Sequence, residues 1–338
     1  MTEISVIGGG AWGTALAASI ARKGQKPYLW VRDEMLFESI AQENQNTQYL
    51  KGIPLPVEIQ PSVNHADLGG ADIVLVVVPT QAIRSVLLSF KGIIKPEATL
   101  VLCAKGLEKE TGKRVSEITH EVMPDNPIAV LSGPSFATDV ARGLPTAVTL
   151  AADNVDHASE LAEAISSPAL RLYASNDIIG VELGGALKNV IALAVGIARG
   201  KNVGASAEAA LTTRGFAELV RIAKHFGAQP ETLMGLSCLG DLVLTCSSPQ
   251  SRNFAYGMAL GAQGAQNGIG AGGADKTSLA SMKLAEGVHT TGIAAQVCRE
   301  AGIDAPIIEA INGVLSDELD IAEAMTGLLA RPLRTEIV

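Results

Sequence analysis

A short apolar run at residues 4–7 leads directly into a glycine-rich turn, which is followed by an alanine-rich helical stretch at 14–22. Three glycines have separate tasks in such a strand-to-helix connection. Gly8 permits the tight turn, Gly10 lets a phosphate approach the backbone, and Gly13 lets the helix pack on the strand. The helix amino terminus adds backbone N–H groups and the positive end of the helix dipole. The segment therefore predicts a unit that binds the pyrophosphate of a dinucleotide.

Further apolar runs continue the alternation of strands and helices. Strands are predicted at 28–31, 73–78, 100–103, 128–131, 147–150 and 170–173, with helices at 82–90, 115–123, 136–142 and 157–165. Continuous apolar strands are typical of a parallel sheet covered on both faces. The pattern predicts the α/β class, with a Rossmann-type doubly wound parallel sheet in a first domain at residues 1–177.

The period of the apolar residues changes at Asn176 and Asp177, which are suited to cap a helix. From there, helices are predicted at 178–199, 208–226, 231–234, 254–260, 278–286, 291–301 and 307–315. The second domain, residues 178–338, is therefore predicted to be all-α. The segment 261–273 is rich in Gly, Ala, Asn and Gln, which predicts a mobile surface loop.

Composition excludes several classes of function. A net charge of −9 disfavours a general nucleic-acid binder, because phosphate backbones attract basic surfaces. Four scattered cysteines without metal-ligand spacing predict no metal site and a reduced, cytoplasmic setting. The amino terminus lacks the basic and apolar regions of a signal peptide. The most apolar helix, 178–197, contains Glu182, Lys188 and Asn189, which favours a buried site over an integral membrane span.

The choice of cofactor depends on the end of the second predicted strand. An acidic residue there binds the ribose 2′-hydroxyl of NAD, whereas arginine accommodates the 2′-phosphate of NADP. The strand ends in Arg32 and Asp33, so Arg32 favours NADP while Asp33 keeps NAD open. Arg32 as an ordinary solvated charge is the alternative. Trp12, inside the glycine turn, either covers the cofactor or packs on the sheet.

Two lysines have positions suited to chemistry. Lys105 follows the strand at 100–103, and open α/β sheets bind ligands at the carboxyl ends of their strands. Lys188 lies inside the first helix of the second domain among small and apolar residues, where an ammonium group needs a partner. The plain alternative for Lys105 is a surface loop lysine, and that alternative is weaker for Lys188.

Two turns carry groups of a type suited to bind anions. Gly133 to Ser135 connects a strand to a helix and offers backbone N–H groups for an anion or a substrate hydroxyl, although such turns are also routine connections. Ser251, Arg252 and Asn253 introduce a helix and form either an ordinary helix cap or a compact phosphate site. Asp241 has the chemistry to orient a lysine or to accept a substrate hydroxyl.

These motifs together resemble the bacterial NAD(P)-dependent sn-glycerol-3-phosphate dehydrogenases. The resemblance covers nearly the whole chain and depends on the order of the glycine turn, Lys105-Gly106, the segments 132–137 and 182–189, Asp241 and the segment 251–254. It implies catalytic roles for Lys188, Lys105 and Asp241. It implies substrate contacts from Lys105, Gly133, Ser135, Lys188, Asp241, Ser251, Arg252 and Asn253, and cofactor contacts from Gly8, Gly10, Ala11, Trp12, Gly13, Arg32, Lys105, Ala137, Arg252, Leu284 and Glu286. The segment 261–275 departs from the family pattern, because it is longer and richer in glycine.

The implied reaction is reversible reduction of dihydroxyacetone phosphate to sn-glycerol 3-phosphate by NADPH or NADH, which feeds glycerophospholipid synthesis. Lys188 would donate or accept the proton, and the enzyme would be a cytoplasmic homodimer. One rival is a two-domain dehydrogenase of hydroxy acids, keto acids or hydroxyacyl thioesters. The phosphate cluster around Arg252 argues against plain hydroxy acids, and the absence of a convincing catalytic histidine argues against thioesters. A second rival is a non-catalytic sensor of the dinucleotide.

Overall fold

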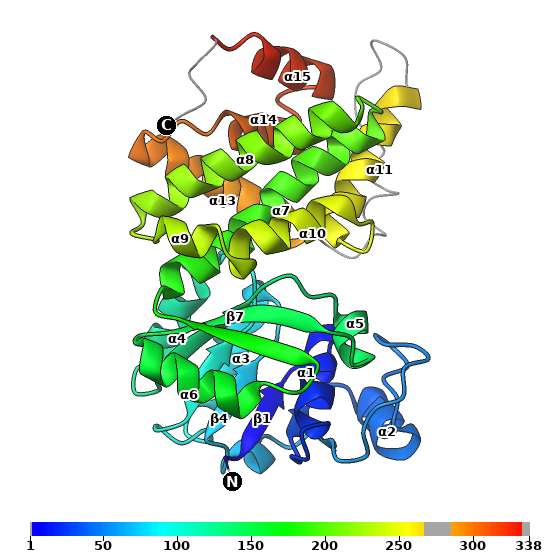
Figure 1. Ribbon diagram of the computed structural model, residues 1–338, viewed down its shortest axis with the longest axis vertical. Helices are drawn as coiled ribbons and strands as arrows, with labels where there is room; N and C mark the ends of the chain where they lie inside the picture. Colours follow the sequence, from blue (N-terminus) through cyan, green and yellow to red (C-terminus); the bar gives the residue numbers. More distant parts are fainter. Residues whose placement is uncertain (1, 267–284, 333–338) are drawn as a thin grey trace. The chain divides into compact units, whose positions relative to one another are not determined.

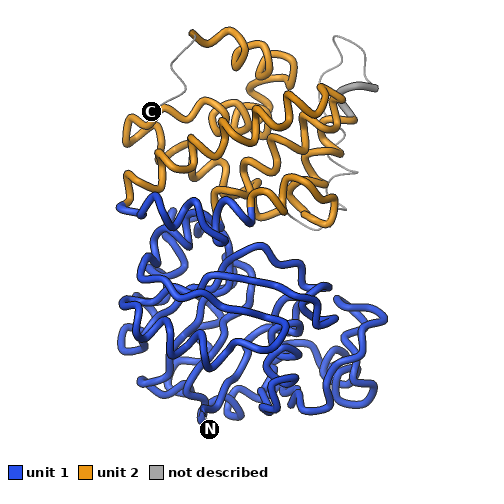
Figure 2. Tube along the Cα trace, in the orientation of Figure 1, with its two compact units in different colours: residues 1–185, 227–241 blue, residues 186–226, 242–338 orange. Residues whose placement is uncertain are grey.

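The structure, a computed structural model, describes residues 2–266 and 285–332, without the side chains of 263–266 (Figure 1). The chain divides into two compact units (Figure 2). Unit 1 contains residues 1–185 and 227–241, and unit 2 contains 186–226 and 242–338. The domain boundary expected between residues 177 and 178 stays a prediction. Most of the helix expected at 278–286 lies outside the described residues.

Unit 1 contains an eight-stranded sheet in the order β3-β2-β1-β4-β5-β6-β7-β8. Its strands are β1 (Ile4–Ile7), β2 (Tyr28–Trp30), β3 (Gln60–Ser62), β4 (Ile73–Val76), β5 (Thr99–Leu102), β6 (Ile128–Ser132), β7 (Thr146–Ala152) and β8 (Leu170–Ser175). Neighbouring strands are parallel except β6 and β7, which pair antiparallel. The predicted doubly wound sheet is therefore confirmed, with one antiparallel pair that was not expected.

The antiparallel pair has a local cause. A parallel crossover usually needs a helix long enough to return the chain to the starting edge of the sheet. The connection from β6 to β7 contains only the five-residue helix α5 (Ala137–Ala141). The chain therefore enters β7 from the edge at which β6 ends, and Ser132 pairs with Thr149.

Helices cover both faces of the sheet, which explains why its strands are continuously apolar. Alternate residues of β1 belong to two different cores: Val6 to one, and Ile7 to the other. The Val6 core is covered by α1 (Ala11–Ala21), α2 (Glu34–Glu43), α5 and α6 (Val155–Ile165), and the Ile7 core by α3 (Ile83–Phe90) and α4 (Val115–Val122). Short helices at η1 (His65–Leu68), η2 (Thr80–Ala82), α9 (Pro230–Leu233) and η3 (Leu236–Gly240) complete unit 1.

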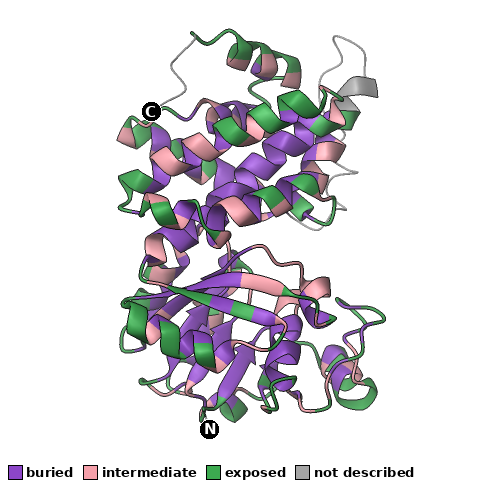
Figure 3. Ribbon diagram, in the orientation of Figure 1, coloured by how far each residue is buried: buried purple, intermediate pink, exposed green. Residues whose placement is uncertain are grey.

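Unit 2 is helical in its described part. Its helices are the second part of α7 (Ile178–Gly200), α8 (Ala205–His225), α10 (Asp241–Ser247, whose first residue belongs to unit 1), α11 (Arg252–Gln266), α13 (Glu286–Ala301), α14 (Pro306–Leu315) and α15 (Ile321–Leu329). The expected cap of α7 is present, because Asp177 Oδ1 accepts from Gly180 N at 2.8 Å. Within the described residues, only α7 is long and apolar enough to cross a membrane, and 89% of its apolar window is buried inside the fold. Most of α7 is accordingly coloured as buried in Figure 3.

The prediction of a loop at 261–273 is wrong for its first six residues, because the helix α11 continues to Gln266. Residues 267–273 lie outside the described part. The glycines of α11 allow it to pack closely on α7. A Cβ at Gly257 would overlap the carbonyl oxygen of Leu193 in α7, and a Cβ at Gly261 would overlap that of Ile197. The sequence alone suggested a loop because glycine is more common in loops than in helix interiors.

Candidate active site

The glycine turn after β1 has the geometry that its sequence predicts. Gly8 has φ +117°, and a Cβ at Gly13 would overlap the carbonyl oxygen of Gly8. Gly10 is the N-cap of α1, and a Cβ there would meet no heavy atom of the described chain within 4 Å. The turn is therefore closed on the sheet side and open at Gly10, which fits a cradle for a pyrophosphate at the helix amino terminus.

The residues expected around the cofactor have different surroundings. Trp12 and Ala137 are partly buried and pack against the core of unit 1. Arg32 is exposed at the end of β2. Asp33 serves as the N-cap of α2, with its Oδ1 accepting from Leu36 N at 2.9 Å. Of the two charges at this strand end, the acidic one is therefore engaged in holding a helix.

Lys105 is held at the carboxyl edge of the sheet by two oxygen atoms. Its Nζ donates to Asp241 Oδ2 at 2.7 Å and to the carbonyl oxygen of Gly133 at 3.0 Å. Ser135 Oγ donates to the same carbonyl at 3.2 Å. The Asp241 side chain is only 3% exposed, so its charge needs this ion pair. Hydrogen bonds thus connect Lys105, Gly133, Ser135 and Asp241 within unit 1.

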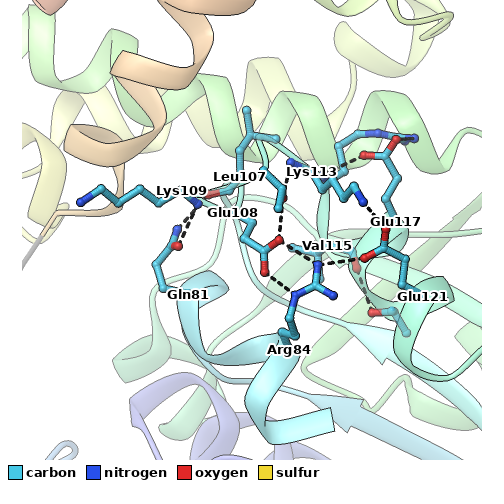
Figure 4. Close-up of polar contacts among 12 residues, drawn as sticks. Gln81, Arg84, Leu107, Glu108, Lys109, Lys113, Val115, Glu117 and Glu121 are labelled. Atoms are coloured by element: carbon cyan, nitrogen blue, oxygen red, sulfur yellow. Dashed lines mark hydrogen bonds and ion pairs between the residues drawn. The ribbon is translucent and has the colours of Figure 1, made fainter. Parts of the chain in front are cut away.

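The loop between β5 and α4, which carries Lys105, makes side-chain contacts with the neighbouring helices η2, α3 and α4 (Figure 4). Gln81 donates to the carbonyl of Leu107 at 2.8 Å and accepts from Lys109 N at 2.9 Å. Arg84 of α3 binds both carboxylate oxygens of Glu108, at 2.9 and 2.8 Å. It also pairs with Glu121 of α4 at 2.9 Å. The hydrogen bonds from Arg84 lower the pKa of Glu108 below its ordinary value.

Glu182 connects α7 to the beginning of α4. Its carboxylate accepts from Ser116 N at 2.8 Å and Ser116 Oγ at 2.5 Å, and it pairs with Arg114 at 3.3 Å. Burial raises the pKa of Glu182, while the bonds from Ser116 oppose that rise. A buried carboxylate that accepts several bonds at a helix amino terminus orients the two helices that it joins.

Lys188 is buried in α7, as its sequence context predicts, with 6% of the residue exposed. Its Nζ donates to Thr245 Oγ1 of α10 at 2.6 Å. The next residue, Asn189, is also buried. The Thr245 hydroxyl thus contributes to positioning Nζ, and an amine carries protons that it can donate.

The segment 251–253 is both a helix cap and part of a wider cluster. Ser251 Oγ accepts from Phe254 N at 3.3 Å, and the exposed Arg252 begins α11. Asn253 Oδ1 accepts from Gly287 N at 2.9 Å. A Cβ at Gly287 would lie 2.7 Å from the carbonyl oxygen of Asn189. The amino-terminal turns of α11 and α13 therefore meet α7 beside Lys188.

The residues predicted to bind the cofactor or the substrate therefore form two groups, one in each compact unit. The unit 1 group contains the glycine turn, Arg32, Lys105, Gly133, Ser135, Ala137 and Asp241, and the unit 2 group contains Lys188, Ser251, Arg252, Asn253 and Glu286. Glu286 is the first residue of α13, and Leu284 lies outside the described residues. Within the described ranges, no group of three His, Cys, Asp or Glu residues could hold a metal ion.

Several residues that the sequence did not single out support these groups. Thr245, Gln81, Arg84 and Asn46 hold Lys188, the Lys105 loop or the glycine turn. No sequence signal identifies them, because each is an ordinary polar residue far along the chain from the group it contacts. Only the pairing of distant segments brings these side chains together.

Comparisons with known proteins show the family to which the chain belongs. The family model for the NAD-dependent glycerol-3-phosphate dehydrogenase N-terminus matches residues 3–158, and the model for its C-terminus matches 177–326. Glycerol-3-phosphate dehydrogenase [NAD(P)+] of Chelativorans sp. (strain BNC1) is 52% identical over 98% of both chains, and that of Brucella canis is 52% identical over 99% of both. The crystal structure of glycerol-3-phosphate dehydrogenase from Coxiella burnetii is 37% identical, has a TM-score of 0.88, and covers 98% of this chain and 99% of its own. The chain therefore belongs to the NAD-dependent glycerol-3-phosphate dehydrogenase family.

Proposed function

We propose that this protein catalyses the reversible NAD(P)H-dependent reduction of dihydroxyacetone phosphate to sn-glycerol 3-phosphate. The observation that carries the proposal is a cluster of residues in unit 2. There the buried Lys188 lies beside the amino termini of α11 and α13, which begin at Arg252 and Glu286. This cluster combines a proton donor with an arginine and two helix amino termini, which are suited to a phosphate. The family membership of the whole chain supports the same reaction.

Lys188 is proposed as the group that transfers the proton. When bound, the reduced nicotinamide supplies the hydride. Negative charge develops on the ketone oxygen as C2 is reduced, and the Lys188 ammonium stabilises that charge and donates a proton to the oxygen. In the oxidative direction, the neutral amine accepts the proton from the hydroxyl. Thr245 holds Nζ in place for this transfer.

The substrate phosphate is proposed to bind at the amino terminus of α11. Arg252 is exposed there and can offer its guanidinium fork to phosphate oxygens. The Asn253 oxygen already accepts from Gly287 N, which leaves its NH₂ group to donate. Ser251 contributes its hydroxyl. In unit 1, Lys105, Asp241, Gly133 and Ser135 are proposed as further substrate contacts, with the Lys105–Asp241 pair suited to bind an alcohol or carbonyl oxygen.

For the cofactor, we propose a preference for NADPH over NADH. The glycine turn is open at Gly10 and fits a pyrophosphate. Asp33 is engaged as the cap of α2, so the exposed Arg32 is the charge at this strand end that remains for a ribose substituent. Arginine attracts a 2′-phosphate, whereas NAD presents only a hydroxyl. Leu284 and Glu286 remain proposed cofactor contacts by resemblance.

The decisive experiment follows the loss of NADPH absorbance, and separately of NADH, with dihydroxyacetone phosphate as the oxidant. We expect rapid oxidation and a larger kcat/KM with NADPH, and Arg32→Ala should reduce that ratio towards one. Oxidation by 2-keto acids with no reaction of dihydroxyacetone phosphate would establish the hydroxy-acid rival. Tight cofactor binding without turnover of either substrate class would favour the sensor.

A cytoplasmic homodimer that supplies glycerophospholipid synthesis is the corresponding proposal for the whole protein. The buried state of all four cysteine thiols and the burial of α7 support a protein that folds in a reducing aqueous compartment. Sedimentation equilibrium tests the dimer, because the expected mass is twice the chain mass of 34.9 kDa. A mass of one chain at micromolar concentration would refute it.

A further inference from the structure

Asn46, in the segment that follows α2, is completely buried and makes three side-chain hydrogen bonds. Its Nδ2 donates to the carbonyl oxygen of Gly9 at 2.9 Å and to Thr14 Oγ1 at 2.8 Å. Its Oδ1 accepts from Tyr49 N at 2.9 Å. Thr14 Oγ1 in turn donates to the same Gly9 carbonyl at 3.3 Å. Two side chains therefore hold one carbonyl in the middle of the glycine turn.

The position of this carbonyl sets the direction of the following N–H. In a trans peptide the C=O and the N–H of one peptide unit point in opposite directions, and the chain has no cis peptide among its described residues. With the Gly9 oxygen turned towards Asn46, the Gly10 N–H points away from it. Gly10 is also the residue of the turn that borders open space.

We propose that Asn46 is a positioning residue of the dinucleotide site. It holds the Gly9–Gly10 peptide in the orientation that presents the Gly10 N–H to the pyrophosphate, and Thr14 assists it. The proposal rests on the proposed function for the cofactor, and it extends the glycine motif by a residue 36 positions beyond Gly10. Glycine at positions 9 and 10 allows the peptide to rotate, so an external hydrogen bond is needed to select one orientation.

A purely structural role for Asn46 is the alternative that the experiment must exclude. Asn46 also orders the segment that follows it, because its backbone oxygen accepts from Leu50 N at 2.9 Å. Loss of a buried amide will lower stability in either case. The two roles differ in which part of the cofactor they affect, since only orientation of the peptide acts selectively on the pyrophosphate.

The test measures dissociation constants by calorimetry for NADPH, NADH and adenosine 2′-phosphate, which carries the adenosine and the 2′-phosphate but no pyrophosphate. Asn46→Leu removes all three side-chain bonds, and Thr14→Val removes the hydroxyl with little change of shape. Asn126→Leu is the matched control. Asn126 is also buried and donates to two carbonyls, those of Lys95 and Ala98, both at 2.9 Å, beside the amino end of β5.

We expect Asn46→Leu to weaken NADPH and NADH binding roughly tenfold, and Thr14→Val roughly threefold, as loss of an oriented hydrogen bond predicts. The affinity for adenosine 2′-phosphate should stay unchanged in both variants, and Asn126→Leu should lose stability without losing cofactor affinity. Unchanged dinucleotide binding, or an equal loss for adenosine 2′-phosphate, would overturn the proposal. If Asn46→Leu does not fold, Thr14→Val decides by the same criteria. Failure of the proposed function appears separately, as wild-type protein that does not turn over dihydroxyacetone phosphate.

Discussion

Lys188 provides the sharpest test at the scale of single residues. Lys188→Ala removes the proposed proton donor, so kcat should fall on the order of 10²- to 10⁴-fold while the NADPH dissociation constant stays unchanged. Stopped-flow turnover and calorimetry measure the two quantities. Lys201→Ala, just beyond the end of the same helix, is the control and should retain wild-type kcat. Wild-type turnover in Lys188→Ala would remove this lysine from the mechanism.

Arg252 tests the phosphate site at the same scale. Arg252→Lys keeps the charge but loses the planar fork that matches two phosphate oxygens. The KM for dihydroxyacetone phosphate should rise about tenfold, which corresponds to ~1.4 kcal/mol, with a smaller change in kcat. Arg221→Lys changes a unit 2 arginine that donates to the Asp304 carbonyl and should leave KM alone. An unchanged KM for Arg252→Lys would leave the segment 251–253 as a helix cap only.

Helix packing in unit 2 is tested by its glycines. Gly257 and Gly261 of α11 face the backbone of α7, and Gly196 and Gly200 of α7 face that of α11. Gly257→Ala would push a methyl group into the Leu193 carbonyl, so we expect a loss of about 1–3 kcal/mol in the free energy of unfolding. Gly292→Ala in α13 is the control, because its nearest neighbour would be Asn312 Oδ1 at 3.7 Å. Denaturant titration should find the control neutral or more stable.

Substitution of Arg84 tests whether its contacts order the loop between β5 and α4. Arg84→Gln breaks the two bonds to Glu108, so the loop that carries Lys105 should become less ordered and the KM for dihydroxyacetone phosphate should rise more than kcat falls. The control Arg299→Gln breaks an exposed ion pair with Glu309 in unit 2 and should leave KM unchanged. Equal KM values for the two variants would show that the Arg84–Glu108 bonds are not needed for substrate binding.

The same ion pair predicts a pH dependence of stability. Arg84 lowers the pKa of Glu108 from its ordinary value of 4.5, so the pair contributes stability above that pH and loses it as the pH falls through the lowered pKa. The stability difference between wild type and Arg84→Gln should therefore shrink in acid. The effect should be small, since the Arg84 side chain is 34% exposed.

At the scale of the whole molecule, Glu218 couples stability to pH in the opposite direction. It lies in α8 and accepts from Ile307 N and Ile308 N at the start of α14. Burial raises its pKa from 4.5 to about 7, against the effect of these bonds. The folded protein therefore binds the proton more tightly than the unfolded chain. The contribution of Glu218 to stability should therefore be most favourable below pH 4.5 and should fall by ~3 kcal/mol as the pH rises to about 7.

Glu218→Gln should abolish this contribution, because the amide stays neutral at every pH. Chemical denaturation from pH 4.5 to 8 should show the variant gaining stability relative to wild type as the pH rises. Arg221, which lies beside Glu218 in α8, should be left unchanged in the experiment because its charge lowers the pKa of Glu218. A constant difference across the range would mean that Glu218 titrates normally.

Local patterns in the sequence were sufficient for the α/β class, the glycine turn and most helices, because each depends on neighbours within a few residues. Sequence context also predicted that Lys188 is buried, since the turns on both sides of it are small or apolar. For Arg252 and Asp241, residue type left more than one role open, and the resemblance to the family selected among them. The short helix α10 and the edge strand β3 were missed, because short elements depend on the surfaces against which they pack.

Residue type and close neighbours were enough to predict which segments turn the chain, which carry charge and which are suited to a phosphate, because those properties are local. Only the tertiary structure decided that Asp33 caps a helix, that Gly257 and Gly261 pack on α7, and that Asn46 holds the glycine turn. These contacts join segments whose separation in sequence carries no periodic signal. Their partners are selected by folding, since buried polar groups and close backbones need a specific neighbour.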